Sequence, residues 1–143
     1  MSLVLEGCTP LLQVFDMPKS VAFYRDVLGF EIAMSSQPGE DFGWGLLRRG
    51  AIEVMLNTAY DTGERPAAPD PARVTAHEDT ALFFACPDLD AAYLHVRTHG
   101  IAAASPSLAP YGRRQLWFHD PDGYAICLQE PGSGDLTSTL RLA

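Results

Sequence analysis

The stretch FHDPDGYAICLQEP, residues 118–131, contains the turn that decides how the C-terminal half of the chain folds. Its Asp-Pro-Asp-Gly segment, 120–123, is a tight-turn sequence with an alternating apolar run on either side, which predicts a β-hairpin. Alternate side chains of the second run, 124–129, point to opposite faces of a sheet. Cys127 therefore lies on the face opposite Ile126, and the function depends on what that second face meets.

The chain also contains an internal repeat, which lies outside this hairpin. VFDMPKSVAFYRDVLGFEIA (14–33) and ACPDLDAAYLHVRTHGIAAA (85–104) both run strand, Asp, helix, Gly, strand. In each repeat the Asp is an N-cap residue and the Gly stands where a helix end requires a positive φ. We therefore expect helices at 17–28 and 89–99.

The remaining elements complete two modules of similar length. Short strands are expected at 9–16, 30–35, 43–48 and 51–56, and then at 80–86, 101–104, 113–119 and 124–129. Prolines and mixed charges interrupt the pattern between the modules and predict a loop without regular structure over most of 57–78. The fold class is α+β, with two βαβββ modules at 5–57 and 79–131, an inter-module loop at 58–78 and a tail at 132–143. Each sheet would carry a helix on one face, and two such sheets that curl toward each other would enclose a cavity.

Composition excludes several classes of protein. The net charge of −8 disfavours a nucleic-acid partner, because phosphate binding needs clustered basic residues. No apolar run reaches the roughly 20 residues of a membrane span, and the N-terminus lacks a signal-peptide pattern. We therefore expect a cytoplasmic protein. The 3 cysteines lack the spacing of a disulfide framework or zinc site.

The sequence resembles the vicinal oxygen chelate superfamily, in which glyoxalase I, extradiol dioxygenases, fosfomycin-resistance proteins and bleomycin-resistance proteins are found. The resemblance rests on FYRDVLGFE (23–31), which follows a strand ending in VFD, and on DPDGYAICL (120–128). It spans about residues 9 to 130 and implies the fold of two βαβββ modules. The fold hosts many chemistries and does not by itself define the function.

The resemblance also implies where a metal would be held in this chain. The metal enzymes of the family take a His from the first strand of a module and a Glu from the last strand, and these donors suit Fe, Ni, Zn or Mn. The corresponding first-strand positions here are Thr9 and either Ala81 or Thr80, and the last-strand position of the second module is Cys127. Only Glu53 matches a family carboxylate. We therefore predict no cofactor, with a divalent metal as the alternative.

Strand alternation divides the side chains between a ligand cavity and a core. The predicted ligand-binding residues are Thr9, Leu11, Gln13, Trp44, Glu53, Met55, Phe83, Gln115, Trp117, Cys127 and Gln129. The predicted core residues that face the helices are Leu12, Val14, Ile52, Val54, Leu82, Phe84, Leu116, Phe118, Ile126 and Leu128. This cavity is mostly apolar and aromatic, as is typical of a small-molecule site.

Two functions remain open at this point. One is a metal-independent protein that sequesters a small molecule, similar to the bleomycin-resistance branch of the family. Its ligand would be aromatic or cationic, stacked on Phe83 and Trp117 and anchored by Glu53. The other is an enzyme, either a glyoxalase-like lyase or isomerase or a ring-cleaving dioxygenase, with Glu53 as candidate catalytic residue and general base. The family resemblance and an uncovered sheet face both predict a homodimer.

Overall fold

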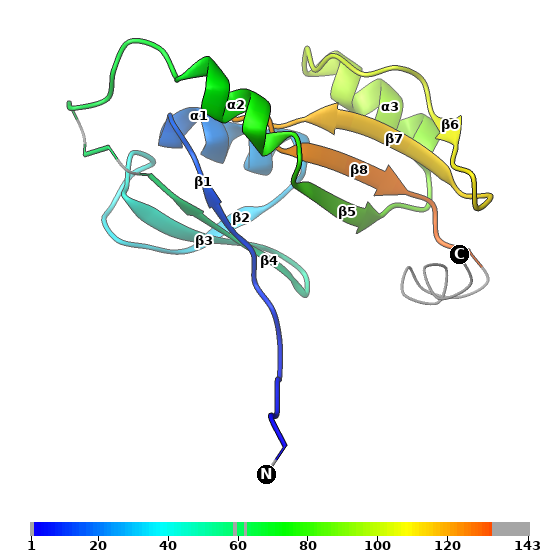
Figure 1. The fold of residues 1–143 in the computed structure, drawn as a ribbon, viewed down its shortest axis with the longest axis horizontal. Coiled ribbons are helices and arrows are strands. Elements are labelled where there is room, and N and C mark those ends of the chain that lie inside the picture. Colours follow the sequence, from blue (N-terminus) through cyan, green and yellow to red (C-terminus); the bar gives the residue numbers. More distant parts are fainter. Residues whose placement is uncertain (1, 59, 62, 133–143) are drawn as a thin grey trace. The chain divides into compact units, whose positions relative to one another are not determined.

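A computed structural model describes residues 2–58, 60–61 and 63–132 of the chain. The chain forms two compact units, Met1–Ala68 and Pro69–Ala143. Each unit contains a four-stranded mixed sheet with a long helical segment along one face (Figure 1). This is the α+β fold of two βαβββ modules that the repeat predicts.

The sheet of the first unit has the strand order β1-β4-β3-β2, with β1 parallel to β4 and the other pairs antiparallel. Its strands are β1 (Leu11–Gln13), β2 (Glu31–Ser35), β3 (Trp44–Arg49) and β4 (Ile52–Asn57). Between β1 and β2 the chain forms α1 (Met17–Ala22), which continues as the π-helical segment η1 (Phe23–Val27). A helix across 17–28 is therefore confirmed.

The sheet of the second unit repeats this topology in the order β5-β8-β7-β6, with β5 parallel to β8. Its strands are β5 (Ala81–Ala85), β6 (Ser107–Leu108), β7 (Arg114–His119) and β8 (Ala125–Gln129). Its helices are α2 (Pro71–His77), which precedes β5, and α3 (Leu89–Thr98), which follows β5.

The local signals that predicted the two longer helices act as expected. The Asp16 side chain accepts a hydrogen bond from the backbone N–H of Lys19 at 3.1 Å, and Asp88 accepts one from Ala91 at 3.0 Å. Both caps satisfy a backbone donor that the first turn of a helix leaves without a partner. Gly29 and Gly100 end these helical segments with the same φ of 77°.

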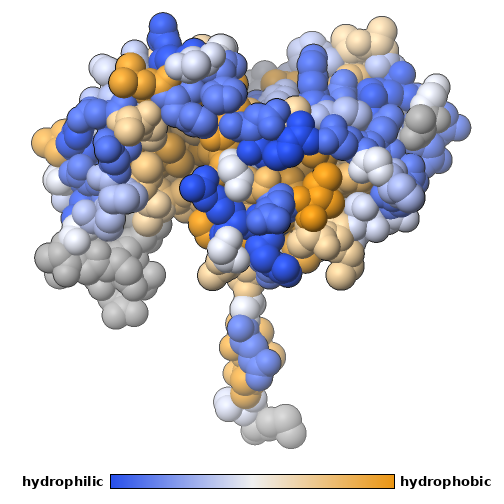
Figure 2. All heavy atoms as spheres, turned by 180° about the vertical axis from the view of Figure 1, so that it is seen from behind, coloured by the Kyte–Doolittle hydropathy of each residue, from blue (hydrophilic) through white to orange (hydrophobic). Residues whose placement is uncertain are grey.

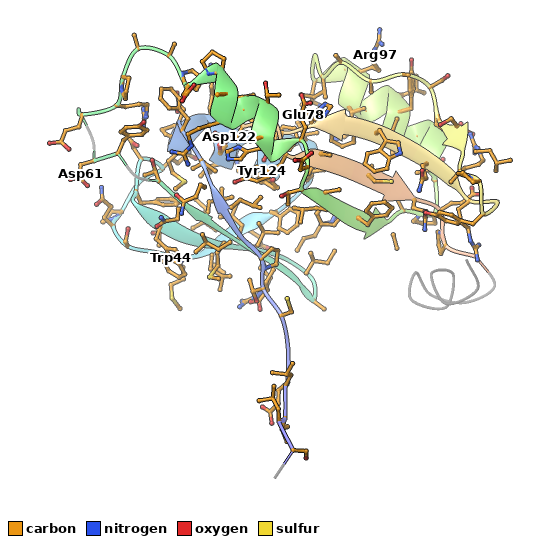
Figure 3. All side chains as sticks on the ribbon, viewed as in Figure 1. Trp44, Asp61, Glu78, Arg97, Asp122 and Tyr124 are labelled. Atoms are coloured by element: carbon orange, nitrogen blue, oxygen red, sulfur yellow. The ribbon has the colours of Figure 1, made fainter. Side chains whose placement is uncertain are left out.

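The prediction of an irregular loop over most of 57–78 is wrong at its C-terminal end, where α2 forms. Asp70 caps this helix by accepting from the N–H of Ala72 at 3.0 Å, and Pro71 occupies its first turn. Asp-Pro is therefore a helix start here, although proline suggested a break. Figure 3 shows Asp122 and Tyr124 beside α2, and the His77 ring stacks on Tyr124 with 4.2 Å between centroids.

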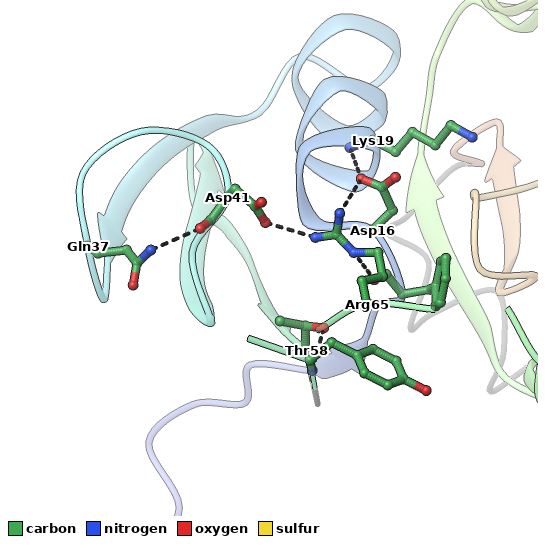
Figure 4. Close-up of polar contacts among 8 residues, drawn as sticks. Asp16, Lys19, Gln37, Asp41, Thr58 and Arg65 are labelled. Carbon is green, nitrogen blue, oxygen red and sulfur yellow. Dashed lines mark hydrogen bonds and ion pairs between the residues drawn. The ribbon is translucent and has the colours of Figure 1, made fainter. Parts of the chain in front are cut away.

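The first part of the same segment is held against the first unit by Arg65 (Figure 4). Its guanidinium donates to the backbone oxygen of Phe15 at 2.9 Å and to the Asp41 carboxylate at 2.8 Å. A second carboxylate, that of Asp16, lies 3.8 Å from the guanidinium. One arginine thus joins the end of β1, the start of α1 and the loop before β3.

The expected short strand at 101–104 is also wrong. Residues 101–106 have no regular structure, and the edge strand β6 forms later, where Ser107 pairs with Gln115 and Leu108 with Arg114. An edge strand is specified on one side only, so its position depends on its neighbour more than on its own residues.

The core between each sheet and its helix matches most of the prediction. Of the predicted core residues, those that are buried are Leu12, Val14, Val54, Leu116, Phe118, Ile126 and Leu128. Leu82 and Phe84 are only half-buried. Ile52 is 42% exposed and is a wrong core prediction. It opens β4 opposite Arg49, directly beside the hairpin turn at the end of the sheet.

Candidate functional site

The candidate site of the second unit lies on the face of its sheet that is opposite α3. Arg114 lies on the same side of β7 as Leu116, and it pairs with Asp90 of α3 at 3.0 Å. The alternate side chains of β7, Gln115 and Trp117, therefore point to the other face. The register aligns two rows of side chains across that face.

The first of these, called the aromatic row, consists of Phe83, Cys127 and Trp117 on β5, β8 and β7. Strands two apart in a sheet are separated by about 10 Å. The Phe83 and Trp117 ring centroids are nevertheless only 5.3 Å apart, in an edge-to-face arrangement. The two rings therefore lean toward each other over the strand that carries Cys127, while 36% of Phe83 and 41% of Trp117 stay exposed.

Cys127 is fully buried under this pair of rings. Burial raises the pKa of the Cys127 thiol to about 12, because the thiolate would lose its hydration there. A nucleophilic cysteine needs a thiolate stabilised by a basic neighbour, whereas this thiol is held neutral. Cys127 therefore acts as a small apolar residue beneath the aromatic row.

The second feature is the amide network, formed by Tyr111, Gln115, Trp117 and Gln129. The Oε1 atom of Gln129 accepts hydrogen bonds from the Tyr111 hydroxyl at 2.6 Å and from Gln115 Nε2 at 2.8 Å. Gln115 Nε2 also donates to the Tyr111 oxygen at 2.8 Å, and Trp117 Nε1 donates to Gln115 Oε1 at 3.1 Å. The network therefore joins Trp117 of the aromatic row to Gln115 and Gln129, which face each other on β7 and β8.

Within the described part of the chain, Gln129 Nε2 is a buried nitrogen without a hydrogen-bond partner. Gln129 itself is 0% exposed. Buried polar atoms are nearly always paired in folded proteins, so this donor is an exception that requires an explanation.

In the first unit, the face opposite the helix carries an apolar row and a charged pair. The apolar row is Leu11, Met55, Leu46 and Met34, aligned across β1, β4, β3 and β2. Leu11 and Met34 at its ends are 46% and 58% exposed. Apolar side chains are thus part of the molecular surface (Figure 2).

Glu53 lies on this same face and forms an ion pair with Arg48, its direct neighbour on β3. The Arg48 guanidinium donates to the Glu53 carboxylate at 2.7 Å, and a third of the Glu53 side chain is exposed. The other predicted residues of this unit, Thr9, Gln13 and Trp44, are half-buried. Trp44 lies on β3 in Figure 3, with Asn57 as its neighbour on β4.

The sequence-predicted site residues thus form two groups, one in each unit, and direct contacts join Phe83, Trp117, Gln115 and Gln129 in the second group. Sequence reasoning missed Tyr111 and Arg48. Tyr111 lies in the 109–112 turn before β7, and no pattern in that loop marks it. Arg48 could have been found by counting outward from Gly50, since the hairpin register places it opposite Glu53.

Among the residues that the structure describes, no group of three or more His, Cys, Asp or Glu side chains lies close enough to hold a metal ion. In the second unit, Ala81 offers no donor atom and Cys127 is a buried, protonated thiol. These residues do not fit the His and Glu ligands of the metal enzymes.

Comparison with known proteins identifies the family. Residues 8–128 match the model of the glyoxalase/bleomycin resistance protein/dioxygenase superfamily. This chain belongs to that superfamily.

Three relatives illustrate the similarity. The uncharacterized protein YaeR of Escherichia coli is 29% identical over 118 residues, which cover 80% of this chain and 88% of that protein. A superfamily member from Sphaerobacter thermophilus is 25% identical with a TM-score of 0.62, over 89% of this chain and 98% of that one. A bleomycin resistance determinant encoded on transposon Tn5 is 22% identical with a TM-score of 0.64, over 88% and 98%.

No helix in the described residues is long and apolar enough to cross a membrane.

Proposed function

We propose that this protein binds a small, flat aromatic molecule without a metal, and that it sequesters the molecule as a resistance protein does. The observation that carries the proposal is the aromatic row: two half-exposed rings lie over Cys127, the position to which the family resemblance assigns a metal ligand. Exposed rings on a sheet face provide stacking area, while the buried thiol beneath them provides no reactive group.

The amide network on the second unit's face supports binding over catalysis, although His119, which pairs with Ala125 on the same face, is a titratable group two residues from Trp117. Catalysis by general acid and base needs a titratable group within hydrogen-bond reach of the substrate. The groups that contact the aromatic row through the amide network are neutral amides, a phenol and an indole. Such groups orient a ligand but do not transfer protons readily near neutral pH.

The first unit supports the alternative function, a metal-dependent glyoxalase-like lyase or isomerase or a ring-cleaving dioxygenase. The family resemblance matches Glu53 to a metal-binding carboxylate, and Glu53 lies on the face opposite the helix and is partly exposed. Its pairing with Arg48 weakens this alternative, because a metal or a substrate proton would have to displace a charged partner. The same pairing weakens Glu53 as the anchor of a cationic ligand.

A homodimer is part of the proposal. The ends of the apolar row on the first sheet, Leu11 and Met34, are exposed. Covering this row would be favourable by about 25 cal/mol per Å² of apolar surface. Sedimentation at micromolar concentration is expected to give twice the 15.6 kDa of one chain. A monomer at that concentration would contradict this part of the proposal.

One set of measurements distinguishes the two functions. Protein prepared without a metal-affinity step is assayed for Fe, Ni, Zn and Mn, and for turnover of a hemithioacetal and of a catechol. Binding of naphthalene derivatives is measured by calorimetry on the same sample. The proposal expects binding, less than stoichiometric metal and no turnover. Stoichiometric metal with turnover that Glu53→Gln abolishes would establish the enzyme instead.

A further inference from the structure

The direction of the amide network is fixed by Trp117. An indole N–H can donate a hydrogen bond but cannot accept one. Trp117 Nε1 donates to Gln115 Oε1 at 3.1 Å, so the other end of this amide, Nε2, is the one that faces Tyr111 and Gln129. Gln115 therefore presents donors, and its neighbours must accept.

This direction determines the orientation of Gln129. Its Oε1 atom accepts from Tyr111 and from Gln115. Turning the Gln129 amide over would place its NH2 group against the NH2 group of Gln115, so that two donors would face each other. The observed orientation is the one that the network allows, and it leaves Nε2 as the end of the amide without a partner.

The two N–H bonds of Gln129 Nε2 are consequently without an acceptor among the described residues, although the residue is completely buried. A buried donor that no acceptor meets is unfavourable, and folded proteins contain few of them. Turning the Gln115 amide over would break the hydrogen bond that Trp117 donates to it, so rotation within the network does not supply an acceptor.

We propose that Gln129 Nε2 donates to an oxygen atom of the bound ligand. This inference rests on the proposed function and specifies the ligand class: an aromatic ring system that carries a carbonyl, carboxylate or phenolate oxygen. Gln129 follows Cys127 by two residues on the same face of β8, which places its Cα about 7 Å along the strand from that of Cys127. A bicyclic ring on Phe83 and Trp117 with an exocyclic oxygen spans such a distance.

The same geometry disfavours a cationic group at this position. Gln129 presents N–H donors there, and an ammonium group would meet them donor to donor. A cationic ligand was expected on the basis of Glu53, which lies in the other unit and is paired with Arg48. The second unit therefore selects oxygen acceptors.

The test uses four probes with the same ring system: 2-acetylnaphthalene, 2-naphthoate, 2-methylnaphthalene and 2-naphthylmethylammonium. Calorimetry and saturation-transfer NMR give their affinities for the full chain. The neutral ketone is expected to bind about five- to tenfold more tightly than 2-methylnaphthalene, since a net hydrogen bond has about that effect. Because the ketone is uncharged, the protein's net charge of −8 does not affect this comparison.

Two substitutions at Gln129 then locate the contact. Gln129→Glu keeps the acceptor of Tyr111 and Gln115 but replaces the donor, so the ketone should lose its advantage and the ammonium probe should gain. Gln129→Met keeps the side-chain length without any donor, and should equalise the ketone and 2-methylnaphthalene. Gln37→Glu is the control, because it makes the same charge change on an exposed side chain far along the sequence. Thermal unfolding establishes that each variant is folded.

The outcomes separate the two proposals. If no probe binds the unmodified protein, the proposed function fails and this inference fails with it. If the probes bind but the ketone has no advantage, or if its advantage survives Gln129→Met, the ligand-binding function stands and the role of Gln129 is wrong. Loss of the advantage in both Gln129 variants, with Gln37→Glu unchanged, supports the inference.

Discussion

The two sheets have the same topology, yet their faces opposite the helices differ in how polar groups are satisfied. The first sheet pairs charged groups, Arg48 with Glu53, at a partly exposed position. The second sheet buries a neutral network, with Gln115 and Gln129 at its centre. The same backbone topology thus carries a charged pair in one unit and a neutral amide network in the other. The side chains on this face do not pack against the helix, so their residue types can differ between the two units.

The hairpin glycines test this comparison with the largest expected effect. Gly50 and Gly123 occupy equivalent turns, with φ values of 58° and 91°. A Cβ atom at Gly50 would meet open space, whereas one at Gly123 would collide with the backbone oxygen of Val74 in α2.

Gly123→Ala is therefore expected to lower the free energy of unfolding by about 3 kcal/mol, and Gly50→Ala by about 1 kcal/mol. Urea denaturation measures both variants side by side. Equal losses would show that α2 does not pack against this turn as described.

The cysteines provide the second test. Cys8 in the first unit is exposed, and Cys127 is buried under the aromatic row. With its pKa raised to about 12 from 9.0, Cys127 would carry about a thousandfold less thiolate at pH 8 than an unshifted thiol. Iodoacetamide followed by mass spectrometry should label Cys8 at least a hundredfold faster than Cys127. Phe83→Ala should reduce this ratio by uncovering the thiol; an unchanged ratio would contradict the stacked arrangement.

The same thiol predicts a pH dependence of stability. Because its pKa is raised in the folded state, the protonated thiol favours folding fully below pH 9. That contribution is lost as the pH rises from 9 toward 12. Other groups titrate in this range, so the measurement is the difference in unfolding free energy between the unmodified protein and Cys127→Ala. The difference should shrink above pH 9, and a constant difference would contradict the raised pKa.

The amide network gives an intermediate effect. Tyr111→Phe removes a hydroxyl that both accepts from Gln115 and donates to Gln129, and should cost about 1–2 kcal/mol. Tyr60→Phe is the matched control in the first unit, where the described contact is an edge-to-face packing of its ring on Phe15. The control should cost less than about 0.5 kcal/mol. Thermal denaturation of both variants decides whether the network is stabilising.

The charged pair of the first sheet gives the smallest effect. Glu53→Gln should change the unfolding free energy by about 0.5 kcal/mol or less, because both side chains are partly exposed to water and salt. The change should vanish in 1 M NaCl, where screening is nearly complete. A loss above about 1.5 kcal/mol that persists in salt would mean that Glu53 has a structural role beyond this pair.

Much of the fold could be predicted from the sequence because its signals are local. The caps at Asp16 and Asp88 and the turn at Gly123 act within a few residues of themselves. Alternation assigned most core residues correctly for the same reason. The errors arose where two local signals competed, as at Asp70-Pro71, where a helix start was taken for a break. They also arose at edges, as at Ile52 and β6, where a strand's surroundings decide its burial or position.

The sequence by itself determined the repeat, the topology of each module and the family, because hydrophobic periodicity and turn residues act along the chain. It also placed Phe83, Cys127 and Trp117 on one face. Only the tertiary structure decided that the two rings lean over the thiol, that Arg48 neutralises Glu53, and that Trp117 fixes which end of Gln129 is left without a partner. These features depend on side chains from different strands or loops, and on the direction in which each hydrogen bond is donated. A one-dimensional pattern does not carry that information.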